Sequence, residues 1–189
     1  MSADFAAARS NMVESQVRTQ DVTDLAIQDA MRHVQREALC PPGKAWLAYA
    51  DSEIEYAPGR WLLKPRDVAK LLQAIRPRAG ESALAIAAPY AAAVMGAMGL
   101  TVTQVMDGDL MSVSGEHDVV ICEGAVDRAP GSWKAALAMG GRLGLVERHG
   151  PVGRAVLYLR SDEGVGSRVL FDSTPPILAG FQAHEGFSF

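Results

Sequence analysis

The histidine, cysteine and serine residues of this sequence are not spaced as the common metal-binding and nucleophilic motifs require. No G-x-S-x-G sequence is present, which leaves an α/β-hydrolase nucleophile elbow unsupported. The two cysteines, Cys40 and Cys122, form no C-x-x-C pair, and we expect both to be reduced thiols of a cytoplasmic protein. We also expect no metal site, because H-x-x-x-H spacing is absent among the four histidines: His33, His117, His149 and His184.

Glu123 is the acidic side chain best placed for chemistry. It directly follows Asp118–Cys122 (DVVIC), a run typical of a central parallel strand. Ligands of such sheets bind beyond the carboxyl ends of the strands, so Glu123 is expected to border a cleft. A helix-capping or salt-bridged carboxylate is the alternative. Cys122 is expected in the core, because Glu123 points to the opposite side of the strand and cannot serve it as a base.

Charge and hydropathy argue against two classes of partner. The 18 Lys and Arg against 22 Asp and Glu give a net charge of -4 without a basic block, so we expect no nucleic-acid partner. The apolar stretch 83–100 is rich in Ala and Gly and holds Pro89 and Tyr90, which favours strand–turn–helix over a membrane span. The opening MSADFAAARS lacks a basic segment followed by an apolar run, and we expect no signal peptide.

Residues 1–76 are predicted to form an N-terminal helical extension and a connector that pack on the main body. The expected order is a helix over 5–17 capped by Asp4, a second helix capped by Asp21 or Thr23, a stop at Pro41-Pro42-Gly43, an aromatic-rich connector with short strands over 44–62, and a helix from Pro65 to Arg76-Pro77.

Residues 77–189 are predicted to alternate strands with helices and to form one structural unit with the extension. Expected are strands over 82–87, 101–106, 118–122, 142–146, 152–159 and 167–171, helices over 90–98 and around 133–139, and a turn at Asp162-Glu163-Gly164. The order strand–helix–strand argues for an α/β domain with a mainly parallel sheet.

Six segments follow one another along nearly the whole chain: MVESQVRTQDVTDLAIQDAMRHVQREALCP, AYADSEIEYAPGRWLLKPRDVAKLLQAI, ALAIAAPYAAAVMGAMG, HDVVICEGAV, LAMGGRLGLV and PILAGF. Together they resemble the protein-L-isoaspartate O-methyltransferase family. The resemblance implies a Rossmann-like methyltransferase fold, S-adenosylmethionine as cofactor, and methyl transfer to isoaspartyl carboxylates of damaged proteins. Such a transfer relies on proximity and orientation, so no catalytic side chain is predicted.

The segment that matches the family's cofactor loop departs from the family's pattern. The family has an acidic residue on the strand and then G-x-G-x-G, whose glycines let the backbone approach the ligand. Here Ala85 stands at the acidic position, and the loop is Ala87, Ala88, Pro89, Tyr90, without glycine. Cβ atoms would abut the ligand and Pro89 removes an N–H donor. We therefore expect that S-adenosylmethionine does not bind in the family's manner.

Two further positions of the family's site differ. Met106 stands where the family has the acid that takes the ribose hydroxyls, and Asp107 follows it directly. Asp107 would substitute only if the strand ends early, because adjacent strand residues point to opposite faces. Leu63, Lys64 and Pro65 match the family's Ser-Gln-Pro on the substrate side. Lys64 either attracts an acidic substrate or is simply solvated.

Residues 108–115 are all that separates the second predicted strand of the sheet from the next one. The family has a helix, a strand and a helix in this place, including the wall that covers the adenine. Eight extended residues reach about 27 Å, which suffices for a return along one strand but not for a crossover helix. We therefore expect an extended connection and a sheet trimmed at one edge.

Two functions from different classes remain. The first is the methyltransferase that the resemblance implies; the second is a non-catalytic relative that keeps the fold as a binding or assembly module, and the altered loop 85–90 favours it. We also expect a homodimer, because a bare sheet edge offers unpaired N–H and C=O groups and the N-terminal helices add apolar residues. A monomer whose helices cover that edge is the alternative, and other proteins are further candidate partners.

Overall fold

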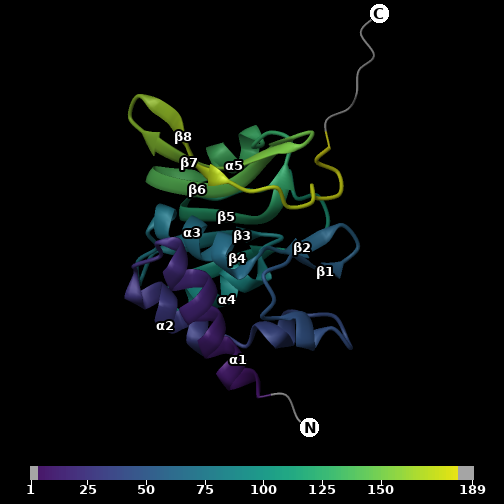
Figure 1. The fold of residues 1–189 in the computed structure, drawn as a ribbon. Coiled ribbons are helices and arrows are strands. Elements are labelled where there is room, and N and C mark those ends of the chain that lie inside the picture. The colour runs from purple at the N-terminus through teal and green to yellow at the C-terminus, as the bar shows by residue number, and fades with distance from the viewer. Residues whose placement is uncertain (1–3, 183–189) are drawn as a thin grey trace, which may run out of the picture.

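A computed structural model describes residues 4–182 as a six-stranded sheet with helices packed against it, plus a small two-stranded sheet (Figure 1). The strands of the large sheet are β3 (Ser82–Ile86), β4 (Thr101–Val105), β5 (His117–Val126), β6 (Leu137–His149), β7 (Val152–Ser161) and β8 (Gly164–Asp172). Their order is β4-β3-β5-β6-β7-β8. The first four run parallel, and β7 and β8 continue the sheet antiparallel. The expected α/β class with a mainly parallel sheet is confirmed.

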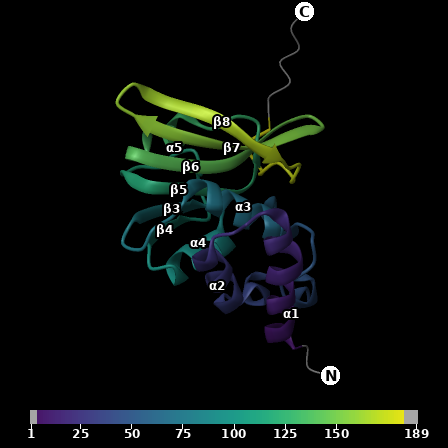
Figure 2. The ribbon, with the colours of Figure 1, turned by 60° about the vertical axis from the view of Figure 1, so that its left-hand side comes forward.

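Helices cover the sheet and extend from one end of it. They are α1 (Phe5–Met12), α2 (Leu25–His33), α3 (Pro65–Ile75), α4 (Pro89–Ala97) and α5 (Gly131–Ala135), with a π-helical turn over Val13–Val17 and 3-10 turns over Arg18–Gln20, Arg36–Leu39 and Ala45–Leu47. Figure 2 shows α1 and α2 at the opposite end of the molecule from β8. No helix in residues 4–182 combines the length and apolar character that crossing a bilayer requires.

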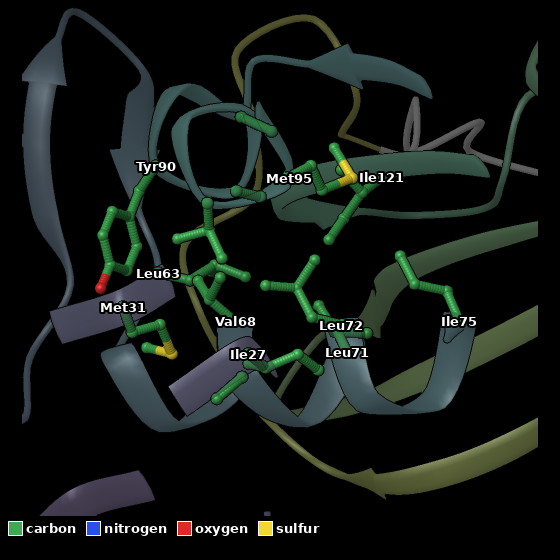
Figure 3. Packing of buried hydrophobic residues seen from close by; sticks show 14 of the residues in the cluster. Ile27, Met31, Leu63, Val68, Leu71, Leu72, Ile75, Tyr90, Met95 and Ile121 are labelled. Atoms are coloured by element: carbon green, nitrogen blue, oxygen red, sulfur yellow. The ribbon is translucent and has the colours of Figure 1, made fainter. Parts of the chain in front are cut away.

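Helix α3 forms the main contact between the extension and the sheet. Pro65 occupies its first turn, where a missing N–H costs nothing, as predicted. Its apolar residues recur at helical spacing, and Leu72 and Ile75 pack with Met95 of α4 and Ile121 of β5 in one buried cluster (Figure 3). The helix ends at Arg76, as predicted, with a left-handed residue at the C-cap.

The trimmed sheet edge is confirmed. Strand β4 pairs only with β3 within the described chain, from Ser82 opposite Thr101 to Ile86 opposite Val105. Residues 106–116, between β4 and β5, contain neither helix nor strand. The connection therefore lacks a crossover helix, as its length requires, but it is not extended throughout, because it turns over 109–112, where the N–H of Ser112 donates to the carbonyl of Asp109 at 3.1 Å.

The N-terminal helices differ from the prediction in two details. Asp4 caps α1 as predicted, but α1 ends at Met12 and the helix continues as the π-helical turn. The cap of α2 is Asp24 rather than Asp21 or Thr23, since the Asp24 carboxylate accepts from the first free N–H groups of the helix. The backbone N–H of Thr23 instead donates to the side chain of Gln73 on α3, and the helix begins one residue later than a Thr23 cap would give.

The helix expected around 133–139 is wrong in its second half. Helix α5 ends at Ala135, and Leu137 begins β6 by pairing with His117 of β5. Pairing with the first residue of β5 thus outweighs the helical propensity of this short segment. The connector forms the expected short strands, β1 (Ile54–Ala57) and β2 (Arg60–Leu62), which pair antiparallel.

Strand β5 bends at Gly124 and then pairs with β6 again, at Ala125 and Val126. Its pairing with β6 is irregular between Ile121 and Ala125, and the backbone at Gly124 is left-handed (φ 121°). Beyond the bend, Ala125 exchanges hydrogen bonds with the segment that carries Leu178: its N–H donates to Pro176 at 3.0 Å, and it accepts from Leu178 at 2.8 Å. Cys122, just before the bend, is fully buried, so its predicted core position is confirmed.

Gly124→Ala is expected to destabilise the fold by about 2–4 kcal/mol. A Cβ at this left-handed position would lie 2.5 Å from Leu178 Cδ2. Gly166→Ala in β8 is the matched control, because a Cβ there meets nothing within 4 Å, and its effect should stay within about 0.5 kcal/mol. Urea denaturation measures both. Equal losses in the free energy of unfolding for the two substitutions would contradict the close packing of Leu178 against Gly124.

Candidate functional site

The segment after β3 turns into α4 within the protein interior. Ala85, Ala87 and Tyr90 are all fully buried, and Pro89 is half-buried. Ala87 adopts a left-handed conformation (φ 46°), in which its N–H donates to the carbonyl of Val105 at 2.9 Å. An alanine here carries a steric cost of roughly 1–2 kcal/mol that glycine would not. The turn therefore forms without a glycine and is packed against neighbouring strands instead of lining an open cleft.

The first turn of α4 is capped by a side chain from another strand. Its own N-cap residue, Ala88, provides no side-chain acceptor. Glu123 of β5 supplies the missing group: its Oε1 accepts from the N–H of Ala91 at 2.7 Å, and its Oε2 accepts from the N–H of Leu63 at 3.1 Å. Glu123 has no exposed surface. One carboxylate thus joins β5, α4 and the connector, which corresponds to the helix-capping alternative for this residue.

A buried arginine lies on the other side of Leu63. Arg36 donates through Nη2 to the carbonyl of Leu63 at 2.6 Å and through Nε to the carbonyl of Ala48 at 2.8 Å. Its guanidinium lies 4.5 Å from the centre of the Tyr90 ring, a cation–π contact. Within residues 4–182 the Arg36 Nη1 atom and the Tyr90 hydroxyl have no hydrogen-bond partner. Both N–H and C=O of Leu63 are therefore held by buried charged groups.

Burial controls the protonation of these groups. It raises the pKa of Glu123 to about 6, against the opposing effects of the Arg36 charge and of the backbone N–H groups that face the carboxylate. Burial also raises the pKa of the Cys122 thiol and of the Tyr90 and Tyr56 hydroxyls. The Cys122 thiol is therefore protonated at neutral pH and is no nucleophile, as the sequence suggested.

Of the positions matched to the family's ribose and substrate contacts, Leu63 binds Glu123 through its backbone N–H, whereas Asp107 and Lys64 do not. Strand β4 ends at Val105, and Asp107 is exposed in the bend that follows it. The strand thus ends before Met106, which was the condition for Asp107 to take the place of the acid that the family has at position 106. Leu63 is buried in the core and acts through its backbone, and the Lys64 Nζ lies 3.8 Å from a carboxylate oxygen of Glu53.

Arg36 and Tyr56 are site residues that sequence reasoning missed. The Tyr56 hydroxyl is buried without a partner in the described chain, and its pKa is raised by burial and then by the charge of Glu123. Both lie in segments that carry the family resemblance, but no spacing of reactive residue types singles them out, so only the packing of the connector identifies them. Within residues 4–182 no three His, Cys, Asp or Glu side chains gather as metal ligands. His184 lies outside the described residues.

The architecture matches solved methyltransferases. A putative protein-L-isoaspartate O-methyltransferase from Plasmodium falciparum, in complex with S-adenosyl-L-homocysteine, superposes with a TM-score of 0.73 over 90% of this chain and 97% of that one, at 13% identity. A second solved protein-L-isoaspartate O-methyltransferase gives 0.73 over 91% of this chain and 66% of that one, at 18% identity. The fold is therefore the Rossmann-like methyltransferase fold that the sequence resemblance implied.

Sequence relatives then specify the family. The chain is 32% identical to protein-L-isoaspartate O-methyltransferase 1 of Rhodopseudomonas palustris (strain HaA2) over 168 residues, which cover 74% of this chain and 69% of the relative. It is 40% identical to the Methylorubrum extorquens (strain PA1) enzyme over 101 residues, 52% of this chain but only 44% of that protein. No family model matches the sequence. The chain belongs to the protein-L-isoaspartate O-methyltransferase family.

Glu123→Gln is expected to remove one pH-dependent component of stability. The pKa of Glu123 in the folded chain is about 6, above its ordinary 4.5, so the folded chain holds this proton more tightly than the unfolded chain. The stabilisation by that proton is complete below the unfolded pKa and is lost as the pH rises through the folded pKa. The loss amounts to roughly 2 kcal/mol in the wild type. Urea denaturation across this pH window measures it, and an unchanged profile in the variant would contradict the assignment.

Proposed function

We propose that this chain is a non-catalytic member of its family, which keeps the methyltransferase fold as a binding or assembly module. The observation that carries this proposal is the buried Glu123 carboxylate at the start of α4. In Rossmann-like sheets the N-terminus of the helix after the first strand is the place where ligand groups meet free backbone N–H donors. In this chain an internal carboxylate takes that place.

The residues present do not fit S-adenosylmethionine in the manner the family implies. The N–H of Ala87 is bonded to Val105, that of Ala91 is bonded to Glu123, and Pro89 has none. The Cβ atoms of Ala87 and Ala88 fill the positions that glycines would leave open, and both residues are fully buried. An incoming cofactor would have to displace packed side chains and break these hydrogen bonds.

The competing hypothesis is methyl transfer from S-adenosylmethionine to isoaspartyl carboxylates. The names of the curated relatives and the S-adenosyl-L-homocysteine in the Plasmodium falciparum structure favour it. It requires a rearranged turn at 85–90 that frees the start of α4. The two hypotheses therefore differ first in cofactor binding, before any question of substrate.

Calorimetry with S-adenosyl-L-homocysteine is expected to give no binding heat with the wild-type chain. The reason is that the donors a cofactor would use are already bonded within the protein. An active isoaspartate methyltransferase titrated under the same conditions provides the positive control. A micromolar dissociation constant for this chain, or methyl transfer to an isoaspartyl peptide, would refute the proposal.

We further propose that the chain self-associates, through the β8 edge rather than through the β4 edge that the sequence suggested. Strand β4 has five residues, and its Thr101, Thr103 and Gln104 side chains are exposed, so that edge is short and polar. Of the N-terminal apolar residues, Ile27 and Met31 are fully buried and only Leu25 is largely exposed. These helices bury their apolar residues in the core of one chain and therefore leave little apolar surface for an interface.

Strand β8 offers an edge with two exposed valines, Val165 and Val169. No other strand of residues 4–182 pairs with its outer side, and it extends over nine residues. Leu170 forms a bulge, so a regular two-fold pairing must lie within Gly164–Val169. Centred on Ser167, it would set Val165 of one copy against Val169 of the other on the same face, whereas centring on Arg168 would oppose two like charges.

Val169→Lys is expected to weaken such a dimer by about tenfold, since it replaces two symmetric valine pairs. Val152→Lys is the control, because Val152 is on β7 and exposed to a similar extent, 53% against 56% for Val169. Sedimentation over a concentration series measures the association. A wild-type chain that stays monomeric at all concentrations would rule out self-association, and equal weakening by both variants would exclude the β8 edge.

A further inference from the structure

The groups around Glu123 form a set of donors that suits a carboxylate in general. The N–H of Leu63 and the N–H of Ala91 approach its two oxygens from different elements, at 3.1 and 2.7 Å. The charge of Arg36 also acts on this carboxylate, and the pKa of Glu123 reflects it. Two fixed backbone donors and one cation are the groups with which proteins commonly bind carboxylates.

The donors exist independently of the Glu123 side chain. Pro89 and Tyr90 fix the first turn of α4, whose N–H groups have no local acceptor because Ala88 cannot cap. The Leu63 backbone is held in place from its other side by Arg36. Arg36 itself is fully buried, and its Nη1 has no partner in the described chain, so an unsatisfied cationic donor remains beside the site.

From this arrangement we infer that the space around Glu123 is a carboxylate-binding pocket that the chain occupies with its own side chain. Shortening that side chain to its Cβ converts the pocket into a receptor for a free short-chain carboxylate. The inference rests on the proposed function in one respect, namely that this helix terminus serves an internal carboxylate and not a cofactor.

Size sets the selectivity of such a pocket. Acetate reproduces atom for atom the part of glutamate beyond Cβ, so it matches the space left by Glu123→Ala. Propionate carries one more carbon, which matches the space left by Glu123→Gly. Formate lacks the methyl group and leaves a void. Because Leu63, Tyr90 and Ala91 are fully buried, the pocket walls do not adapt as an exposed surface would.

The test is thermal unfolding of Glu123→Ala at pH 6 in sodium acetate, against sodium chloride of equal ionic strength. The melting temperature is expected to rise by about 4 °C once acetate exceeds its dissociation constant about tenfold. Propionate and formate should give smaller shifts. In Glu123→Gly the preference should change from acetate to propionate. If either variant is unfolded without ligand, recovery of its far-ultraviolet circular dichroism by the matching carboxylate is the readout.

Three controls decide the outcome. The wild type and Glu123→Gln keep the pocket filled and should not respond specifically to acetate. Glu147→Ala also removes a carboxylate with two donors, Ala129 N–H at 2.8 Å and Tyr158 hydroxyl at 2.6 Å, but in a half-buried place open to water. An acetate response in Glu147→Ala equal to that in Glu123→Ala, or no acetate-specific shift in Glu123→Ala, would overturn the inference.

The result is separable from that of the proposed function. Cofactor binding by the wild-type chain would refute the non-catalytic assignment and leave the acetate response of the variants to be judged by itself. A wild type without cofactor binding, combined with variants that do not distinguish acetate from chloride, would refute the pocket alone.

Discussion

The structure depends on one buried carboxylate that holds three separate segments together. Glu123 links the central strand β5 to the start of α4 and to the backbone of the connector at Leu63. Burying a carboxylate is costly unless it is hydrogen-bonded and faces a positive charge, and here backbone donors and Arg36 provide both. The raised pKa of Glu123 is the part of that cost which the surrounding groups leave uncompensated.

The position of the core explains how a methyltransferase sheet that lacks a strand at one edge remains a complete fold. The parallel strands β3 and β5 are buried on both faces, and α3 and α4 pack on one of them, so the loss of a strand beyond β4 removes no part of this core. The helix and strand that the family's pattern has in this place would lie at the sheet edge beyond β4. Next to the start of α4, the buried side chain of Glu123 and the buried turn at Ala87 fill the place where the family's pattern would leave room for a cofactor.

The sequence predicts the sheet better than the site. Alternating and continuous apolar runs indicate the strands. Pro65 indicates a helix start, and the length of 108–115 excludes a crossover helix. The same reasoning places Glu123 just after a strand over 118–122, whereas β5 continues to Val126 and Glu123 lies within it. The direction of the Glu123 side chain does not follow from the sequence. It depends on the bend at Gly124 and on the packing of that glycine against Leu178, far along the chain. The burial of Arg36 likewise depends on the path of the connector, for which no periodicity exists.

The left-handed conformation of Ala87 has a consequence for how this loop can change by mutation. Glycine at 87 would relieve the backbone while leaving the start of α4 capped by Glu123, and a change at Glu123 alone would expose the donors while leaving a methyl group in the turn. A loop that is open in the family's manner therefore requires changes at both positions, because neither substitution alone removes the methyl group and also frees the donors.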